Sequence, residues 1–421
     1  MNKPLISCGP WLTNPDIGRI TVGFTTTRPS IASLEFRRTS GEPWKKVFQS
    51  KGGQITRDET CHVFHLSGLL PGAHYDYQVG AFEEESGKEE KRSASFTVFD
   101  PSRKQYSFMV LADLQFVPLK RQFLIRKYHE LCAAAECDFV VMLGDMCGEI
   151  NHFEQDILED HVNLLCELGA SSRPVVFLRG NHELRGQESS RWNQFFGTPF
   201  GTSYSQFRQG PAAFLALDSW SDQPSGPDNP AFRWNLDREF LEEEKQFIRE
   251  TVSSPAFLDA PFRIVLAHGA SHAHIDQFDF LGRNMRFLTD EFFRGENPQV
   301  PLHLWICGHI HHYIRSVPFK AECASIHPPP QPVVTPDQYS FPLITTDGPD
   351  VLKEIVPPSG IQSSAFVVSV SEDTLDVRAI SEERGLIDHF TIYRDHQVIE
   401  KMDTPHFLWK SSCFIPAIEI K

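Results

Sequence analysis

The sequence predicts two domains, an all-β sandwich over residues 1–100 followed by an α/β domain over residues 101–421. Three observations lead to this fold class. The length of 421 residues exceeds that of one ordinary domain. Short runs of β-branched and apolar residues, separated by turn signals, fill the first part. From residue 106 onward, short apolar runs alternate with helical patterns, which is typical of an α/β domain.

Five strands are expected in the first domain, at residues 19–27, 30–38, 61–66, 75–82 and 93–99. This spacing of short strands favours a β-sandwich. Tyr75 follows Leu69 by six residues across a Pro-Gly turn. The pattern resembles the tyrosine corner of fibronectin type III domains, in which the phenol bonds back to the backbone. A plain turn before an aromatic strand residue is the alternative. The acidic stretch 83–90 is expected to be a solvated hairpin tip.

Buried strands are expected in the second domain at residues 106–112, 139–143, 174–178, 214–217, 263–267 and 302–307, because each is a short apolar run. Helical patterns lie between them, at about 120–136, 153–168 and 237–253. The last helix is charged on one face and carries Leu241, Phe247 and Ile248 on the other. Residues 221–230 and 321–342 are Pro-rich and predict surface loops. Further strands are expected at 365–370, 375–380 and 389–393.

Five of the six buried strands lead directly into side chains of the types that can bind metals. The loops at the carboxyl ends of strands in α/β sheets converge on one crevice, so these side chains are expected to meet. Mixed oxygen and nitrogen donors suit Mn²⁺, Fe and Zn²⁺, and a carboxylate such as Asp145 can bridge two ions. The motifs are Asp113-Leu114-Gln115, Gly144-Asp145, Gly180-Asn181-His182-Glu183, Val265-x-x-His268 and Gly308-His309-Ile310-His311.

In this order the five motifs resemble the signature of calcineurin-like metallophosphoesterases, over roughly residues 106–400. The resemblance implies a four-layer α-β-β-α sandwich with two Mn, Fe or Zn ions at one edge. It implies that a hydroxide bridging the metals is the nucleophile, and that His182 contacts the phosphate or protonates the leaving group. The implied ligands are Asp113, Gln115, Asp145 and His311 for the first ion, and Asp145, Asn181, His268 and His309 for the second. Glu183 is expected to support its neighbours.

A sandwich ahead of such a domain resembles the arrangement in plant-type purple acid phosphatases. Those enzymes carry glycine in the first motif and an iron-binding tyrosine after the second. Here Gln115 and Gly148 stand at these two positions, so Fe(III)–tyrosinate chemistry is not expected. A D-x-Q motif is similar to that of manganese-dependent ADP-ribose/CDP-alcohol diphosphatases and some related protein phosphatases. Glutamine is a weaker ligand than histidine, which favours Mn²⁺ or Fe²⁺ at the first site.

The sequence therefore predicts a phosphoesterase for small phosphorylated substrates. The architecture favours a phosphomonoesterase, whereas Gln115 favours a phosphodiester or nucleoside-diphosphate-type pyrophosphate hydrolase. A catalytically silent binding module is a further alternative, which the intact ligand set disfavours. The formal net charge of −15 argues against a nucleic-acid polymer as partner and against a nuclease. Arg179, beside the third motif, is either a phosphate contact or a surface residue.

No apolar run of about 18 residues is present, so no membrane contact is expected. The N-terminus lacks the apolar core of a signal peptide, which predicts a cytoplasmic protein, or a secreted one if a signal was trimmed. The nine cysteines are odd in number and form no C-x-x-C pair, which favours reduced thiols. A homodimer is compatible with these features.

Overall fold

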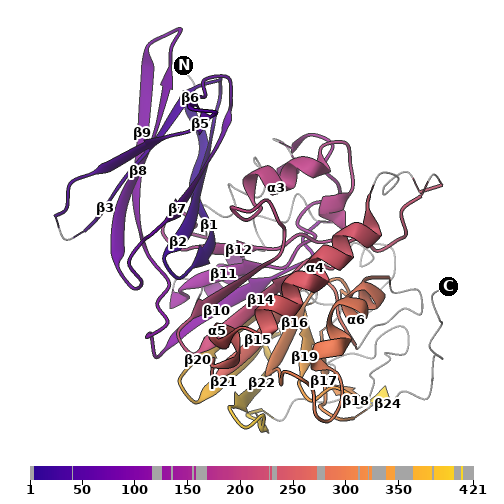
Figure 1. Ribbon diagram of the computed structural model, residues 1–421. Coiled ribbons are helices and arrows are strands. Elements are labelled where there is room, and N and C mark those ends of the chain that lie inside the picture. The colour runs from indigo at the N-terminus through magenta and orange to yellow at the C-terminus, as the bar shows by residue number, and fades with distance from the viewer. Residues whose placement is uncertain are drawn as a thin grey trace.

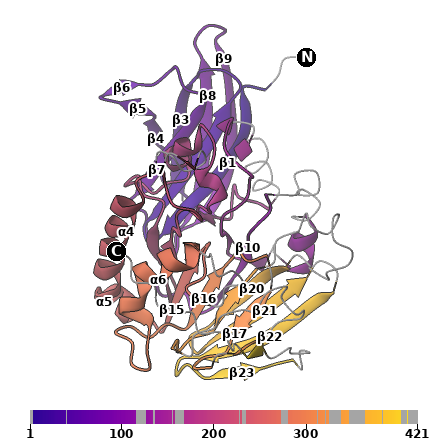
Figure 2. The same ribbon diagram turned by 90° about the vertical axis from the view of Figure 1, so that its right-hand side faces the viewer.

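A computed structural model describes residues 4–39, 41–115, 126–133, 136–153, 156–157, 168–226, 228–229, 235–272, 280–311, 313–320, 322–324, 338–346, 364–381, 384–402 and 409–410. These residues form sheets of ten, eight, four and two strands. The sandwich rises above the larger second part, as Figures 1 and 2 show from two sides.

The N-terminal part is a sandwich of two antiparallel layers. The first layer consists of β1 (Ile6–Asp16), β2 (Arg19–Thr26) and β7 (Cys61–Ser67). The second consists of β4 (Lys45–Phe48), β3 (Ile31–Arg38), β8 (His74–Glu83) and β9 (Lys88–Thr97). A hairpin of β5 (Ser50–Lys51) and β6 (Gln54–Ile55) lies beside them. Phe24, Tyr77 and Phe96 are fully buried, and the rings of Tyr77 and Phe96 lie 5.6 Å apart.

The predicted tyrosine corner is confirmed, because the backbone N–H of Leu70 donates to Tyr75 Oη at 3.1 Å. Residues 84–87 form the turn between β8 and β9, as expected for a hairpin tip. Glu90, however, is not simply solvated. Its Oε2 atom accepts the backbone N–H groups of Leu5, at 2.5 Å, and Ile6, at 3.2 Å.

A single ten-stranded sheet joins the sandwich to the second part of the chain. Strand β1 pairs in parallel with β12 (Val175–Phe177), with Thr13 opposite Val175. The strand order is β23-β22-β21-β20-β10-β11-β12-β1-β2-β7. Strand β1 was not predicted, because Pro10 and Pro15 interrupt its pattern and remove two N–H donors from the ladder.

The second part is built on two stacked sheets, and all six predicted buried strands and the three late strands are confirmed. Phe108 and Phe139 of the ten-stranded sheet pack against Phe214 of the eight-stranded sheet, with ring centroids 5.5 and 5.9 Å away. The first sheet adds β10 (Tyr106–Leu111), β11 (Phe139–Met142), β20 (Ser364–Val370), β21 (Thr374–Ser381), β22 (Gly385–Tyr393) and β23 (Val398–Glu400). The second sheet contains β13 (Ser205–Gln209), β14 (Ala212–Leu217), β15 (Phe262–Ala267), β16 (Leu304–Cys307), β19 (Leu343–Thr345), β17 (Ile314–Ser316), β18 (Glu322–Ala324) and β24 (Trp409–Lys410).

Helices α4 (Asp237–Val252), α5 (Pro255–Leu258) and α6 (Phe280–Phe293) lie on the eight-stranded sheet (Figure 1). The predicted apolar face of α4 is confirmed, because Ile248 is buried and Leu241 and Phe247 pack against the same core. Three short helices follow the third motif: η3 (His182–Leu184), η4 (Ser189–Arg191) and α3 (Trp192–Phe195). Residues 126–131 are helical, within the helix predicted at 120–136. Most of the helix predicted at 153–168 lies outside the described residues.

In the part of the chain that the structure describes, no helix is both long and apolar enough to cross a lipid bilayer.

Candidate metal centre

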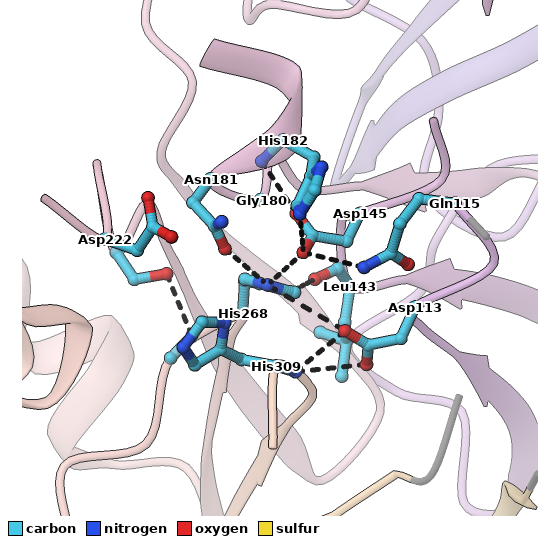
Figure 3. A network of polar contacts seen from close by, with 12 residues as sticks. Asp113, Gln115, Leu143, Asp145, Gly180, Asn181, His182, Asp222, His268 and His309 are labelled. Carbon is cyan, nitrogen blue, oxygen red and sulfur yellow. Dashed lines mark hydrogen bonds and ion pairs between the residues drawn. The ribbon is translucent and has the colours of Figure 1, made fainter. Parts of the chain in front are cut away.

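The ends of five strands bring the sequence-predicted site residues into one group, and Figure 3 labels all of them except His311, which lies beside Asp113 and Gln115. Strands β10, β11 and β12 of the ten-stranded sheet lead to the first three motifs, and β15 and β16 of the eight-stranded sheet lead to the other two. The group therefore lies where the carboxyl ends of the two stacked sheets meet. The residues are Asp113, Gln115, Asp145, Asn181, His182, His268, His309 and His311.

Asp145 is the centre of this group. Its Oδ2 atom lies 3.1 Å from His268 Nε2 and 3.8 Å from His182 Nε2, and it accepts Gln115 Nε2 at 3.2 Å. Its Oδ1 atom accepts the backbone N–H of His182 at 2.8 Å. The ligand atoms of Asp145, His268 and His309 all lie within 4.8 Å of one another. One carboxylate is thus shared by side chains from both sheets.

Asp113 lies beside this centre and is fully buried. Its two carboxylate oxygens accept the backbone N–H of His309 at 2.9 and 3.0 Å. Its Oδ1 atom is 3.5 Å from His311 Nε2 and 4.0 Å from His268 Nε2. Gln115 Nε2 lies 3.3 Å from His311 Nε2. Two overlapping sets of oxygen and nitrogen atoms therefore share the space around Asp113 and Asp145.

The backbone of the group is strained at four of the predicted ligands. Asp113, Asp145, His309 and His311 have φ values of 59°, 53°, 70° and 54°. Each non-glycine residue in this left-handed region costs about 1–2 kcal/mol, and such residues cluster at functional sites. Gly144 is required where it stands, because its φ is +90° and a Cβ there would lie 2.4 Å from Gly180 N.

The His268 ring is oriented as a metal ligand would be. Its Nδ1 atom lies 2.8 Å from the carbonyl oxygen of Leu143, so that Nδ1–H donates there. The Nε2 atom then faces two acceptors, Asp145 Oδ2 and Asn181 Oδ1, each at 3.1 Å. Two oxygens around a ring nitrogen require a proton or a cation between them. A backbone carbonyl that orients a ligating histidine in this way is common at metal sites.

Gln115 gives a second test of fit. Its Oε1 atom is buried and has no hydrogen-bond partner among the described residues. Such an orphaned acceptor costs on the order of 1–3 kcal/mol. A 180° rotation of the amide exchanges oxygen and nitrogen, and it would bring Oε1 towards Asp145 and His311. The acceptors gathered there would repel one another without a cation, so the donor set of Gln115, Asp145 and His311 fits a bound metal.

Electrostatics within the group follow from burial and from the Asp145–His268 pair. Burial opposes the charged forms of both, but their mutual attraction outweighs it. The pKa of His268 is therefore raised, to about 10, and that of Asp145 is lowered. Burial raises the pKa of Asp113 to about 7, with the His268 charge acting against the rise and the Asp145 charge adding to it. Burial lowers the pKa of His311 to about 3. A cation would remove the repulsion between the two carboxylates.

Glu183 supports the loops around the centre. Its fully buried carboxylate accepts the backbone N–H groups of Asp145 at 2.9 Å, Met146 at 2.7 Å and Gly180 at 2.8 Å. Burial raises its pKa, and the negative charge of Asp145 adds to the rise. The carboxylate thus fixes the second motif relative to the third, as the sequence analysis expected.

Arg179 is not a surface residue, which corrects one of the two interpretations. Its side chain is buried, and its Nε and Nη2 atoms lie 2.8 and 2.7 Å from Asp218 Oδ2. The guanidinium stacks on Trp220, 5.1 Å from the ring centroid. Asp218 follows β14, the one predicted buried strand without a ligand motif at its end, and sequence reasoning gave it no role. Its signal was the same as for the ligands, a carboxylate directly after a buried strand.

Other candidates do not reach the centre. His272 is buried and stacked on Tyr339 at 4.1 Å, and His303 is buried, as predicted. Cys147 and Cys307 are buried, as expected. Trp192, Phe195 and Phe196 belong to the hydrophobic core, which favours packing over substrate stacking for them. His274, His312, Phe232, Trp234 and Phe278 lie outside the described residues.

Comparison with known families agrees with this geometry. Residues 106–313 match the model of the calcineurin-like phosphoesterase family. These residues form a calcineurin-like phosphoesterase domain. The matched segment contains every member of the residue group around Asp145, and this family holds a dinuclear metal centre.

The calcineurin-like phosphoesterase domain and the sandwich ahead of it recur together in solved structures. The purple acid phosphatase PPD1 from yellow lupin (Lupinus luteus) seeds superposes with a TM-score of 0.63 at 15% identity, over 91% of this chain and 74% of that one. PhoD superposes with a TM-score of 0.59 at 12% identity, over 96% and 94%. At these identities the likeness shows a shared fold. A search of curated proteins found no match to the sequence.

Proposed function

We propose that the chain is a dinuclear-metal phosphoesterase that hydrolyses phosphate esters of small substrates, with phosphomonoesters slightly preferred. The observation that carries the proposal is the arrangement around Asp145, whose carboxylate is within 3.8 Å of side chains from three other motifs. Buried carboxylates, an orphaned amide oxygen and a histidine facing two acceptors support a site for cations. Bound metal ions can polarise a phosphoryl group and stabilise the charge that develops during hydrolysis.

Each ion has its own set of donors in this proposal. Asp145 belongs to both sets. The first ion would be held by Asp113, Gln115, Asp145 and His311, and the second by Asp145, Asn181, His268 and His309. Mn²⁺, Fe and Zn²⁺ fit this mixture of carboxylate, amide and imidazole donors. Bound ions would neutralise charge on the phosphoryl oxygens and lower the pKa of a coordinated water to near 7.

His182 provides the group that moves a proton. Its Nδ1 atom lies 2.6 Å from the carbonyl oxygen of Gly148, so that Nδ1–H donates to the backbone and fixes the ring. The Nε2 atom is left facing Asp145 Oδ2, at 3.8 Å. A phosphate held near Asp145 would therefore meet Nε2, which can donate a hydrogen bond or protonate the leaving oxygen.

The substrate class rests on two opposing features. The shared fold with a purple acid phosphatase favours monoesters, whereas Gln115 favours phosphodiester or nucleoside-diphosphate-type pyrophosphate hydrolysis. The net charge of −15 supports a small substrate over a nucleic-acid polymer. Six described cysteines are buried and form no disulfide with another described residue, which supports a reducing, cytoplasmic location. No membrane contact is proposed, and a homodimer remains part of the proposal.

Turnover of two aryl esters tests the function. The purified chain is incubated with added Mn²⁺, Fe²⁺ or Zn²⁺, and release of p-nitrophenol is followed from p-nitrophenyl phosphate and from bis-p-nitrophenyl phosphate. Faster release from the monoester supports the preferred class, and faster release from the diester supports the alternative. Release from neither ester under any metal would contradict a phosphoesterase and favour a catalytically silent binding module.

A further inference from the structure

We propose that a cavity at the junction of the sandwich and the calcineurin-like phosphoesterase domain is a second binding site, which takes a small uncharged aromatic molecule. The cavity has a volume of about 400 Å³. Sites for small molecules typically measure about 300–1,000 Å³, so this one has room for a ligand of one or two rings. None of the predicted metal ligands lines it. The proposal therefore does not depend on the proposed function.

Both parts of the chain form the walls of the cavity, and hydrogen bonds between them hold the walls in place. Asn14 of β1 donates through Nδ2 to the carbonyl oxygens of Phe196, at 3.3 Å, and Gly197, at 2.9 Å. Asp16 Oδ1 accepts the backbone N–H of Arg208 at 3.2 Å. The cavity is thus formed before a ligand arrives, and binding does not have to order its walls.

Phe200 lies at the open side of the cavity. Its side chain lines the cavity although 78% of the residue is exposed, which is the highest value among the exposed large hydrophobic residues that the structure describes. Backbone hydrogen bonds from Thr198 to Thr202, at 2.8 Å, and from Gly201 to Thr198, at 2.9 Å, close the loop that carries it. The ring is therefore held at the surface by a well-bonded loop, and a ligand in the cavity would cover part of its apolar area.

Aromatic side chains dominate the walls and indicate a flat ligand. The Phe177 and Phe196 rings lie 4.9 Å apart, and the Tyr204 and Phe247 rings lie 5.0 Å apart, between centroids. All four residues line the cavity. Rings pack against one another in stacked or edge-to-face arrangements, which favours an aromatic ligand over a branched aliphatic one.

The charges of the walls exclude an ionic ligand. Asp16 and Arg19 are the charged residues that line the cavity, and their Oδ2 and Nη2 atoms form an ion pair at 2.5 Å. The two charges cancel, so an ion in the cavity would lose water without gaining an unpaired counter-charge. A phosphorylated substrate is therefore not the expected occupant, and an uncharged molecule is.

The cavity shares a wall with the third motif. Leu178 lines it and directly precedes Arg179. Ser203 lines it as well, and its Oγ atom lies 3.2 Å from Arg179 Nη2. A bound molecule would therefore connect the sandwich to the segment that leads to Asn181 and His182.

Binding of 2-naphthol, a fluorescent and uncharged two-ring molecule, tests the proposal without any hydrolysis. Fluorescence titration of the full chain should show one site with a Kd of about 0.1 mM or lower. Naphthalene-2-sulfonate has the same rings and a permanent negative charge, and it should bind at least about 10-fold more weakly. Equal affinity for the two molecules, or no saturable binding of 2-naphthol, would overturn the proposal.

Two variants locate the bound molecule. Ser205→Trp should abolish binding, because half-buried Ser205 lines the cavity on the same face of β13 as Phe207. Phe200→Ala should raise the Kd at least about 3-fold, whereas Phe319→Ala, which alters an exposed aromatic outside the cavity, should not change it. Melting curves establish that each variant is folded. An unchanged Kd in folded Ser205→Trp would place the molecule elsewhere and overturn the proposal, and if that variant does not fold, an unchanged Kd in Phe200→Ala would do so.

Discussion

His268 Nε2 lies 3.1 Å from Asp145 Oδ2, although the two residues are 123 positions apart and follow strands of different sheets. This contact ties the carboxyl end of β15 to that of β11. It places a ring nitrogen of His268 beside the Asp145 carboxylate, which residues of the other motifs also approach. The ligand group consequently depends on the stacking of the two sheets.

Loss of a metal ligand should abolish hydrolysis, whether that ligand serves both proposed ions or only one. Asp145→Asn removes the negative charge common to both proposed ions, and His309→Ala removes a donor from the second. Because metal ions stabilise the transition state by several kcal/mol, we expect each variant to lose at least about 1000-fold in turnover. Circular dichroism should show an intact fold. Activity near that of the wild-type protein in either variant, with metal in excess, would refute the ligand assignment.

Gln115→His should change metal preference and leave the protein active. Imidazole is a stronger donor than an amide oxygen for Zn²⁺ and Fe. The buried Gln115 Oε1 atom has no hydrogen-bond partner among the described residues, so a bound ion can occupy this position. The measurement is the ratio of turnover with Mn²⁺ to turnover with Zn²⁺. A lower ratio in the variant is expected. An identical ratio would count against Gln115 as a ligand.

Glu183 should matter for stability before it matters for chemistry. Glu183→Ala leaves three buried backbone N–H groups without their acceptor, so we expect the free energy of unfolding to fall by on the order of 3 kcal/mol. Urea denaturation measures the loss. Glu188→Ala is the matched control, because its partly exposed carboxylate accepts one backbone N–H, from Phe153, and pairs with Arg191. Its loss should cost only about 1 kcal/mol. Equal losses in the two variants would contradict the role given to Glu183.

Arg179→Met should destabilise the chain and not weaken substrate binding directly. It leaves Asp218 charged and unpaired in a fully buried place, which typically costs about 3–5 kcal/mol. The double variant with Asp218→Asn should recover part of this loss, and denaturation of all three proteins measures the coupling. If Arg179→Met keeps full stability and only raises KM, then Arg179 is the phosphate contact that the sequence left open.

Stability should decline in mild acid because two buried histidines are held neutral. Burial lowers the pKa of His62 to about 4 and that of His303 to about 3, while an unfolded histidine has a pKa near 6.5. The unfolded chain therefore takes up protons first as the pH falls, and the folded state loses stability from about pH 6.5 down to about pH 4. His62 alone should account for on the order of 3 kcal/mol.

Denaturation of the wild-type protein and of His62→Gln at pH 7.5 and at pH 5 checks this sign. The variant should lose less stability between the two pH values. A decline of equal size in both proteins would show that His62 is not held neutral by burial.

Much of the fold and of the site could be predicted because each motif directly follows an apolar strand. Asp113 and His309 are read from the sequence in this way, and the structure brings them into contact. The pairing of β1 with β12 could not be predicted, because Pro10 and Pro15 break the strand pattern. Parallel pairing between two strands so far apart in the chain also gives no signal in the local sequence. The ion pair between Arg185 and Asp222 could not be predicted, because neither residue directly follows a strand and their contact depends on two separate loops.

The metal content of the gently purified chain, measured by plasma mass spectrometry, tests the central claim most directly. The account predicts about two Mn, Fe or Zn ions per wild-type chain, and clearly fewer in Asp145→Asn, whose carboxylate belongs to both donor sets. A wild-type chain that holds no metal, even after incubation with Mn²⁺, Fe²⁺ or Zn²⁺, would contradict the dinuclear centre.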